Sequence, residues 1–330
     1  MSAIAVWAEV SDGRIKKPVW EALTMARSWA DSLGLPVWAV LIGESFPDSV
    51  STVLGDYGAD KVVRISHPKL NPLVNSAYAR TLAAFLQEKD ISYAVLPQTY
   101  DGRAIAPLLA IWADAALLSG ISQAPEKEGN GFKARRVCYS NKGIEWVYTE
   151  HPRVIATLRP NAAVPAKSPR TPQIEDWTFT PEEKDLRARP VGVEKVTTDK
   201  IPLTEAEIVV SAGRGLKGPE NWGMVEELAR VLGAATACSK PVADVGWRPH
   251  HEHVGQTGIQ ISPNLYIAIG ISGAIQHLAG VASSKNIVVI NSDPEAPFFK
   301  VADYGIVGDA FDVVPRLTQA IKSYKEQHAS

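Results

Sequence analysis

The stretch VGQTGIQISPNLYIAIGISGAIQHLAG, residues 254–280, joins a glycine-rich polar loop, an apolar run and a helix entrance. The run Leu265 to Ile271 is rich in β-branched residues and too short for a helix, which predicts a strand buried on both faces of a parallel sheet. Ser272 suits the N-cap of a helix beginning near Ala274. Gly273 lacks a Cβ, so the backbone there can approach a ligand closely. The segment therefore predicts a ligand site at a helix start, where an anion such as a pyrophosphate is favoured.

Composition limits the class of protein. The chain has 330 residues, which is too long for one ordinary core and suggests two domains. Lys and Arg number 34 against 36 for Asp and Glu, and no basic block is present, so we expect no nucleic-acid partner. Cys138 and Cys238 lack metal-ligand spacing and fit a reducing compartment. No apolar run approaches a membrane span and no signal segment precedes Ile4, so we expect a cytoplasmic protein without membrane insertion.

The first half alternates strand-like and helix-like segments. Strands are predicted at 4–10, 37–42, 61–65 and 93–97, and helices at 18–33, 72–89 and 103–115. This order predicts a mostly parallel sheet covered by helices, similar to a nucleotide-binding domain. Three short segments, 132–140, 144–150 and 153–159, are predicted to add an antiparallel edge to that sheet.

The second half is predicted to be a separate, doubly wound α/β domain. Prolines and charges dominate 160–202, which we interpret as a linker, with the boundary close to Lys195 and domains at 1–195 and 196–330. Strands are predicted at 207–211, 265–271, 287–291 and 304–307, a strand and loop at 234–242, and helices at 222–232, near Phe298 and from Phe311 onward. Ligands bind at the carboxyl ends of such strands. The polar residues there are Arg214, Ser239, Gln256, Ser272, Asn291 and Asp309.

Three strings in the second half carry a resemblance to a known family. VGQTG at 254–258, LYIAIGISGAIQHLAG at 265–280 and INSDPEAPFFKVADYGIVGD at 290–309 resemble the FAD-binding domain of the electron transfer flavoprotein α subunit. The resemblance is continuous from about Ile208 to the C-terminal helix, and it is looser through TYDGRAIAPLLA at 99–110. It therefore covers most of the chain.

The resemblance implies which residues hold FAD. They are Arg214, Ser239, Lys240, Val254, Gly255, Gln256, Thr257, Ser272, Gly273, Ala274, Ile275, Gln276, His277, Asn291, Asp309 and Ala310. Ser272 and Gln276 are expected at the pyrophosphate, and Thr257 near N5 of the flavin ring. Asn291 and Asp309 are expected toward the adenosine end.

Two of these residues are expected to tune the flavin. His277 matches a histidine near the flavin O2, where a donor stabilises the negative charge that appears on reduction. Lys240 departs from the family pattern, because most relatives carry an arginine after the serine that matches Ser239. The charge is kept but the planar guanidinium is lost, so redox tuning at this position is expected to differ.

The resemblance also implies an electron carrier with one FAD. It would pair with an electron transfer flavoprotein β subunit, which holds AMP or a second FAD. Electrons would come from acyl-CoA dehydrogenases of fatty acid β-oxidation, or from similar flavoenzymes, and pass to a membrane-bound quinone oxidoreductase. An electron-bifurcating, NADH-linked flavoprotein complex is the alternative within the same family.

Neither catalytic residues nor a metal site is predicted. No nucleophile with a base and no carboxylate pair accompanies the site, and Ala212-Gly213-Arg214-Gly215 is only a fragment of a dinucleotide fingerprint. The adjacent residues of His250-His251-Glu252-His253 would diverge from any metal, so we interpret them as a solvated loop. An NAD-dependent α/β enzyme, which would need a catalytic His or Lys, and an interaction subunit without a cofactor are the alternatives from other classes.

Overall fold

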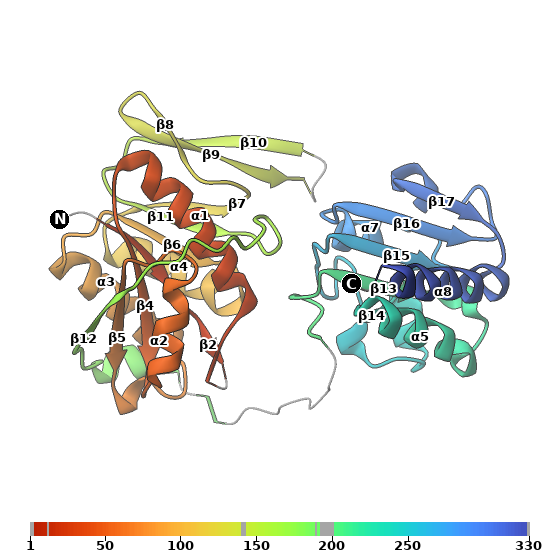
Figure 1. The fold of residues 1–330 in the computed structure, drawn as a ribbon, viewed down its shortest axis with the longest axis horizontal. Coiled ribbons are helices and arrows are strands. Elements are labelled where there is room, and N and C mark those ends of the chain that lie inside the picture. The colour runs from red at the N-terminus through yellow and green to blue at the C-terminus, as the bar shows by residue number, and fades with distance from the viewer. Residues whose placement is uncertain (1–2, 12, 140–142, 189, 192–200, 329–330) are drawn as a thin grey trace. The chain divides into compact units, whose positions relative to one another are not determined.

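The chain is described by a computed structural model that covers residues 3–11, 13–139, 143–188, 190–191 and 201–328. Two compact units are built from these residues (Figure 1), one from 3–138 and 143–191 and the other from 201–328. The predicted boundary at Lys195 lies outside the described residues.

A ten-stranded sheet runs through the first unit. Its strands are β1 (Ile4–Trp7), β4 (Val37–Gly43), β5 (Lys61–Ser66), β6 (Tyr93–Pro97), β7 (Ala116–Ile121), β8 (Glu126–Glu128), β9 (Gly131–Cys138), β10 (Gly143–Thr149), β11 (Val154–Leu158) and β12 (Gln173–Trp177). Their order is β10-β9-β7-β11-β6-β1-β4-β5-β12, with β8 paired to β9. The strands from β7 to β12 along this order pair in parallel. A short hairpin, β2 (Val10–Ser11) and β3 (Arg14–Ile15), follows β1.

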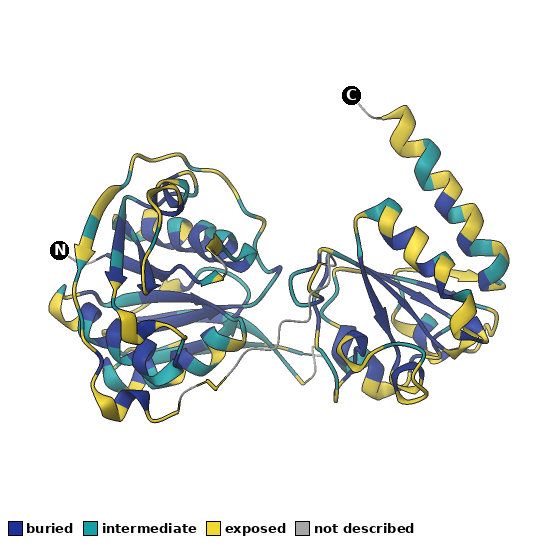
Figure 2. Cartoon of the chain, turned by 90° about the horizontal axis from the view of Figure 1, so that it is seen from below, coloured by how far each residue is buried: buried dark blue, intermediate teal, exposed yellow. Residues whose placement is uncertain are grey.

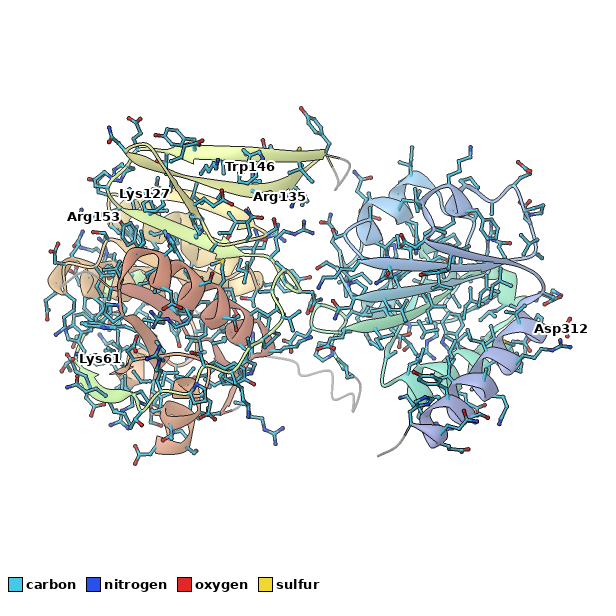
Figure 3. All side chains as sticks on the ribbon, turned by 45° about the horizontal axis from the view of Figure 1, so that its top comes forward. Lys61, Lys127, Arg135, Trp146, Arg153 and Asp312 are labelled. Carbon is cyan, nitrogen blue, oxygen red and sulfur yellow. The ribbon has the colours of Figure 1, made fainter. Side chains whose placement is uncertain are left out.

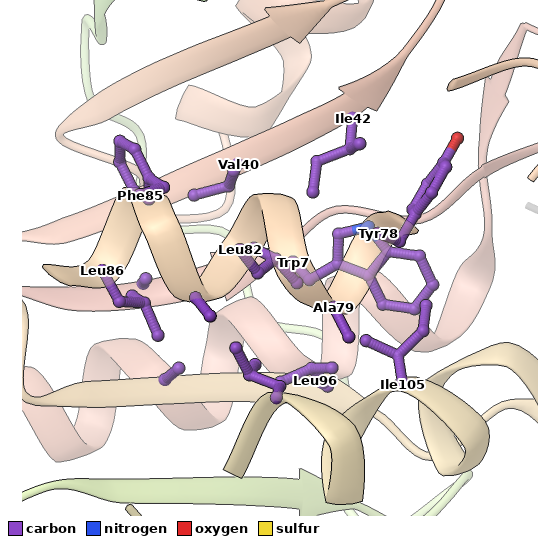
Figure 4. Close-up of a cluster of buried hydrophobic side chains, with 14 of the residues drawn as sticks. Trp7, Val40, Ile42, Tyr78, Ala79, Leu82, Phe85, Leu86, Leu96 and Ile105 are labelled. Atoms are coloured by element: carbon purple, nitrogen blue, oxygen red, sulfur yellow. The ribbon is translucent and has the colours of Figure 1, made fainter. Parts of the chain in front are cut away.

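Helices cover both faces of this sheet. Side chains alternate between the two faces along each strand, so a central strand such as β1 presents buried residues to both layers of helices. Ile4 and Val6 of β1 pack with residues of α1 (Lys17–Leu33) and α2 (Asp48–Gly55). Ala5 and Trp7 pack on the opposite face with α3 (Asn75–Glu88) and α4 (Tyr100–Trp112), and Figure 4 shows Trp7 in that cluster. Figure 2 shows the burial of the strands between these helices. Both faces of the sheet are therefore core, as the alternating pattern predicts.

The strands β9 and β10 form the antiparallel edge that is predicted, and β8, which is not among the predicted strands, pairs with β9. Trp146 on β10 is directly paired with Arg135 on β9 (Figure 3), and about half of the Trp146 side chain is exposed. The Nζ atom of Lys133 on β9 lies 5.3 Å from the centroid of the Trp146 ring, within the range of a cation–π contact.

Two predictions about the first unit are wrong. The segment expected as a third antiparallel edge strand is β11, which lies inside the sheet, parallel to both β6 and β7, with every residue buried. The linker prediction for 160–202 is wrong in part, because β12 pairs with β5 at the other edge of the sheet. Its tryptophan, Trp177, packs against Phe85 and donates to Glu88 at 2.8 Å. The polar sequence of an edge strand resembles that of a linker, which explains this miss. The elements α2 and β7 are not among those predicted.

A buried carboxylate follows β1, and its removal should destabilise the first unit. Glu9 is 2% exposed, pairs with Lys16, and accepts from Thr99 Oγ1 at 2.6 Å. Burial raises its pKa, while Lys16 and Thr99 act in the opposite direction. Glu9→Gln should lower the free energy of unfolding by about 1–3 kcal/mol, because it removes one partner of a buried ion pair. Urea unfolding at neutral pH measures the change.

An exposed acidic residue provides the matched control for Glu9. Glu183 pairs with Lys69, and both side chains are largely in solvent. Glu183→Gln should change the free energy of unfolding by less than about 1 kcal/mol. Equal stabilities for the two variants would contradict the role given to Glu9.

The second unit contains a five-stranded, all-parallel sheet. Its strands are β13 (Ile208–Ala212), β14 (Ala235–Cys238), β15 (Leu265–Ile269), β16 (Asn286–Asn291) and β17 (Tyr304–Val307), and their order is β14-β13-β15-β16-β17. The helices α5 (Gly223–Leu232), α6 (Lys240–Asp244) and α8 (Ala310–Gln327) pack on one face. The helix α7 (Ile275–Val281) and the 3₁₀ turn Pro297–Val301 pack on the other. The predicted doubly wound domain is confirmed.

The strand order places a switch point between β13 and β15. Counted within the unit, the strands lie in the order 2-1-3-4-5. The connection that leaves β13 leads to one side of the sheet, to β14, and the connection that leaves β15 leads to the other side, to β16. Ligands of such sheets bind in the crevice at that point. None of the helices in the described part of the chain is long and apolar enough to cross a bilayer.

Candidate cofactor site

A cavity of about 650 Å³ lies at the switch point of the second unit. Small-molecule sites commonly measure about 300–1,000 Å³, so the cavity has the size of a cofactor site. It is lined by Arg214, Ser239, Lys240, Pro241, Asp244, Val245, His253, Val254, Gly255, Gln256, Thr257, Gly270, Ile271, Ser272, Ala274, Gln276 and His277. These residues follow β13, β14 and β15, as the sequence predicts for ligand-binding positions.

Glycines allow the loops after β13 and β15 to touch at the cavity wall. The Gly215 amide donates to the Gly270 carbonyl at 3.1 Å, and a Cβ on Gly215 would lie 2.6 Å from the Gly270 Cα. Any side chain at Gly215 would therefore push the two loops apart. The fragment Ala212-Gly213-Arg214-Gly215 thus shapes the wall of the cavity through this close backbone approach.

The helix α7 begins later than predicted, and Ser272 is not its N-cap. Ala274 is the N-cap residue and no side chain caps the helix. Gly273 has φ +83 and Ala274 is extended, so Ser272 lies too far from the first helical amides to cap them. A Cβ on Gly273 would lie 2.6 Å from the Phe298 backbone nitrogen. The close approach that Gly273 permits is therefore to Phe298, while Ser272 lines the cavity.

The loop Val254–Thr257 is tied to both walls of the cavity. Val254 N donates to Cys238 O at 3.0 Å, and Gln256 N donates to Gln276 O at 2.7 Å. A Cβ on Gly280 would lie 2.5 Å from the Gly255 Cα, so the loop lies directly on α7. The exposed side chains of Gln256 and Thr257 line the cavity.

His277 is a buried imidazole in the cavity wall. The side chain is 7% exposed, and its Nε2 lies 2.7 Å from the Tyr266 hydroxyl. Burial, together with the nearby His253, lowers the pKa of His277 to about 4. The Val254 backbone acts on the ring in the opposite direction, although Nδ1 makes no hydrogen bond of standard geometry. His277 is therefore neutral near pH 7.

Two cations at the cavity have no partner among the described residues. Arg214 follows β13 and Lys240 is the first residue of α6, and both side chains are exposed. Neither makes a hydrogen bond or an ion pair with the part of the chain that the structure describes. Both are thus available to an anionic ligand, such as a phosphate.

Five of the sixteen predicted site residues do not line the cavity. They are Gly273, Ile275, Asn291, Asp309 and Ala310. Asn291 ends β16 and its Nδ2 donates to Ile271 O at 3.0 Å. Asp309 follows β17 and caps α8 by accepting from Phe311 N at 2.9 Å. Asn291 and Asp309 therefore lie farther along the carboxyl edge of the same sheet, at the ends of β16 and β17. The other eleven predicted residues are brought together by the cavity.

The solvated-loop prediction for 250–253 is wrong for Glu252 and His253. Glu252 is 5% exposed and accepts two hydrogen bonds from Arg248, at 2.7 and 2.6 Å. The Arg248 guanidinium also lies 5.3 Å from the centroid of the Trp222 ring. His253 is buried, which lowers its pKa, and it lines the cavity. The arginine four residues before Glu252 is the signal that could have indicated a buried pair. No group of metal-binding side chains occurs within the described ranges.

The cavity also contains residues that sequence reasoning missed. They are Pro241, Asp244, Val245, His253, Gly270 and Ile271. Asp244 and Val245 end the short helix α6, which was expected as a strand and loop. Since α6 begins directly after Ser239, its turn brings these side chains back toward the cavity. Ser239 at the N-cap position and Pro241 in the first turn are the signal that could have indicated α6.

The fold and the cavity define the class of protein. A parallel sheet with strand order 2-1-3-4-5, glycine-lined loops at its switch point and unpaired cations beside the cavity is a doubly wound nucleotide-binding domain.

Comparisons with known proteins identify the family. Residues 202–282 match the family model described as the electron transfer flavoprotein FAD-binding domain, and residues 4–182 match the electron transfer flavoprotein domain. The chain is 39% identical to the electron transfer flavoprotein subunit alpha of Bacillus subtilis, over 97% of each chain. It is 35% identical to the subunit of the same name from Thermoanaerobacterium thermosaccharolyticum, over 98% of each. The chain belongs to the electron transfer flavoprotein α-subunit family, and these two relatives are named as subunits of electron carriers.

A further relative has a different name. The chain is 31% identical to the lactate dehydrogenase (NAD(+),ferredoxin) subunit LctC of Acetobacterium woodii, over 97% of this chain and 77% of that one.

Proposed function

We propose that this chain is the FAD-binding α subunit of a heterodimeric electron transfer flavoprotein, with one FAD in the cavity at the switch point. The cavity carries the proposal, because all its lining residues lie within the segment that matches the FAD-binding domain. We also propose that 1–195 and 196–330 are the two domains and that the second holds the cofactor.

The residues present fit FAD. Arg214 offers positive charge for the pyrophosphate, Ser272 and Gln276 offer polar side chains beside it, and Lys240 offers positive charge for the flavin ring. Gly255 and Gly270 line the cavity without side chains, at φ +156 and +59, so a ligand can approach the backbone closely there. Asn291 and Asp309 lie along the same sheet edge, in the direction where an extended dinucleotide would place its adenosine.

The protein groups in the cavity would position and tune the cofactor. FAD supplies the one- and two-electron chemistry when it is bound. Arg214 would neutralise the phosphates, while the loop Val254–Thr257, held on α7 by Gln256, would fix one side of the cavity. His277 would contribute a neutral donor in a site of low dielectric, where such a donor acts strongly.

The names of the relatives support a two-subunit protein. We propose that the partner is an electron transfer flavoprotein β subunit that carries AMP or a second FAD. Electrons would come from acyl-CoA dehydrogenases or similar flavoenzymes and pass to a quinone oxidoreductase, in the cytoplasmic compartment and at its membrane surface.

The test is to purify this chain together with its β subunit and to identify the bound cofactor. We expect the visible bands of a flavin and one FAD released from the α chain, with bleaching when an acyl-CoA dehydrogenase and its substrate are added. A colourless protein that binds NAD saturably would instead support the NAD-dependent enzyme. A colourless protein that binds neither would support an interaction subunit.

An electron-bifurcating complex is a second candidate, favoured by the similarity to the lactate dehydrogenase subunit. In that case the purified heterodimer should contain two FAD molecules and oxidise NADH when ferredoxin is supplied. A single FAD together with AMP, and no reaction with NADH, would exclude this candidate.

The side chain of Lys240 should raise the reduction potential of the bound flavin. Its ammonium lies at the cavity wall and is exposed, so its effect is screened by solvent. Lys240→Gln should lower the first potential by about 20–60 mV, roughly a two- to tenfold change in a one-electron equilibrium. Lys240→Arg keeps the charge and should leave the potential near that of the parent. Spectroelectrochemical titration compares the variants, and a Gln variant within about 10 mV of the parent would show that Lys240 does not act on the flavin.

A further inference from the structure

His253 is a second buried imidazole in the cavity wall, and it comes from a different element than His277. Its side chain is 7% exposed and lines the cavity. Its backbone forms an isolated bridge with Cys238, the last residue of β14. The backbone therefore holds the imidazole at the carboxyl end of the sheet, where ligands of such sheets bind.

Two glycines make room for the ring of His253. A Cβ on Gly258 would lie 2.7 Å from Nδ1 of the imidazole, and a Cβ on Gly255 would lie 3.2 Å from Nε2. The Ile259 amide donates to the His253 carbonyl at 2.9 Å, so the loop turns back over the imidazole. Gly255 lines the cavity and Gly258 does not, which places Nε2 on the cavity side of the ring.

Both ring nitrogens of His253 are free to exchange protons. Neither makes a hydrogen bond with the part of the chain that the structure describes. Neither is fully enclosed by protein, in contrast to Nδ1 of His277. A neutral imidazole has one N–H group and one nitrogen with a free lone pair. Protonation of His253 therefore breaks no hydrogen bond with the described residues.

Charges on α6 and on the neighbouring loop act on this imidazole. Burial is the largest influence and lowers the pKa of His253, and Lys240 and His250 act in the same direction. Asp244 acts in the opposite direction. Lys240 and Asp244 also line the cavity. His253 is therefore neutral near pH 7, with a carboxylate in the same cavity that favours its protonated form.

The other titratable groups around His253 are neutral or paired near pH 7. Burial raises the pKa of the Cys238 thiol to about 12. Burial and His253 itself lower the pKa of His277 on α7 to about 4. The carboxylate of Glu252, the preceding residue, is paired with Arg248. The charge of His253 thus responds to α6 and to the molecule that fills the cavity.

Reduction of the flavin changes the charge in this cavity. The pyrophosphate, which we place at Arg214 and Ser272, carries the same charge in both oxidation states. The ring, which we place at Lys240, gains negative charge on reduction. Since Lys240 and His253 interact electrostatically in the same cavity, negative charge that appears beside Lys240 favours a proton on His253.

We propose that His253 is a redox-linked proton acceptor: when the flavin in the cavity is reduced, the imidazole takes up one proton from solvent, and its positive charge stabilises the negative charge on the ring. This inference rests on the proposed FAD-binding function. The electron comes from the reduced donor flavoenzyme, and the proton from water that reaches the cavity past the exposed side chains of Lys240 and Asp244. On reoxidation the electron passes to the acceptor and the proton returns to solvent.

The pH dependence of the first reduction potential tests the proposal in the complete heterodimer. The pKa of His253 should be lower in the oxidised protein and higher in the reduced protein, so reduction binds one additional proton between these two values. The potential therefore falls as the pH rises through this window. We expect reduction to change the protonation equilibrium of His253 by about tenfold, which lowers the potential by about 59 mV in total across the window.

His253→Gln removes the titrating group and keeps a polar side chain. Spectroelectrochemical titration of this variant between about pH 5 and 8 should show only the pH dependence of the flavin itself, with a total fall about 59 mV smaller than in the parent. His251→Gln is the matched control, because His251 is exposed and does not line the cavity, and its curve should follow that of the parent. A His253→Gln curve parallel to that of the parent would overturn the proposal.

The protonation of His253 is also measurable without any substitution. In ¹⁵N NMR of the histidine-labelled heterodimer, with His253 assigned through its backbone neighbours, the ring nitrogens report the proton directly. Their titration midpoint should lie at a proton concentration about tenfold lower in the dithionite-reduced protein than in the oxidised protein. Equal midpoints would overturn the proposal even if His253→Gln fails to fold. Failure of the proposed function has a different signature, because the purified heterodimer would then contain no flavin.

Discussion

Gly273→Ala should lower the free energy of unfolding of the second unit by about 2–6 kcal/mol, which is a large part of the stability of a typical domain. The backbone at Gly273 has φ +83, a conformation that costs a residue with a Cβ about 1–3 kcal/mol. The added Cβ would also lie 2.6 Å from the Phe298 backbone, and overpacking of this kind costs about 1–3 kcal/mol more. FAD affinity should fall as well, because Ser272 and Ala274 line the cavity on either side.

Gly223 provides a matched control for Gly273. It begins α5 with helical dihedral angles, and nothing lies within 4 Å of its ideal Cβ position. Gly223→Ala should therefore raise the free energy of unfolding by about 0.5–1 kcal/mol. Chemical denaturation, monitored by the release of the flavin, measures the free energy of unfolding of both variants. If the two alanines change stability equally, the strain and the contact with Phe298 are not what requires a glycine at position 273.

The buried His277 should make the second unit less stable as the pH falls. Its pKa is about 4 in the folded chain against about 6.5 for an exposed histidine, so the unfolded chain binds more protons between these values. The neutral imidazole makes its full contribution to the free energy of unfolding above about pH 6.5, and this contribution is lost progressively as the pH falls toward 4. The loss attributable to His277 should reach about 3 kcal/mol, since each unit of pKa difference corresponds to about 1.4 kcal/mol.

The measurement is a series of unfolding experiments from pH 7.5 to 4 on the parent and on His277→Gln. Carboxylates and the neighbouring His253 also titrate in this range, so the difference between the two proteins isolates His277. The stability of the parent should fall more steeply than that of the variant below pH 6.5. Parallel curves would mean that His277 ionises in the folded chain as readily as in the unfolded one.

Local sequence determined most of the elements and the family. The β-branched run around Ile267 predicted β15, and Pro18 with Gly34 marked the ends of α1, whose last turn is followed by Gly34 at φ 66. These signals are strong because they depend on residues close together in the chain. The strings around His277 and Asp309 then identified the family and a set of residues, of which the structure gathers eleven around one cavity.

Tertiary structure alone decided the features that depend on residues far apart in the sequence. Whether 154–158 is an edge or a central strand depends on which strands flank it, and an edge strand such as β12 has the polar composition of a linker. Gly273 is required by the backbone of Phe298, and the burial of Glu252 follows from Arg248 and Trp222. The contact between Tyr266 and His277 likewise arises from a strand and a helix that pack together. Burial and hydrogen-bond partners are properties of packing, so a pattern of neighbouring residues suggests candidates but does not select among them.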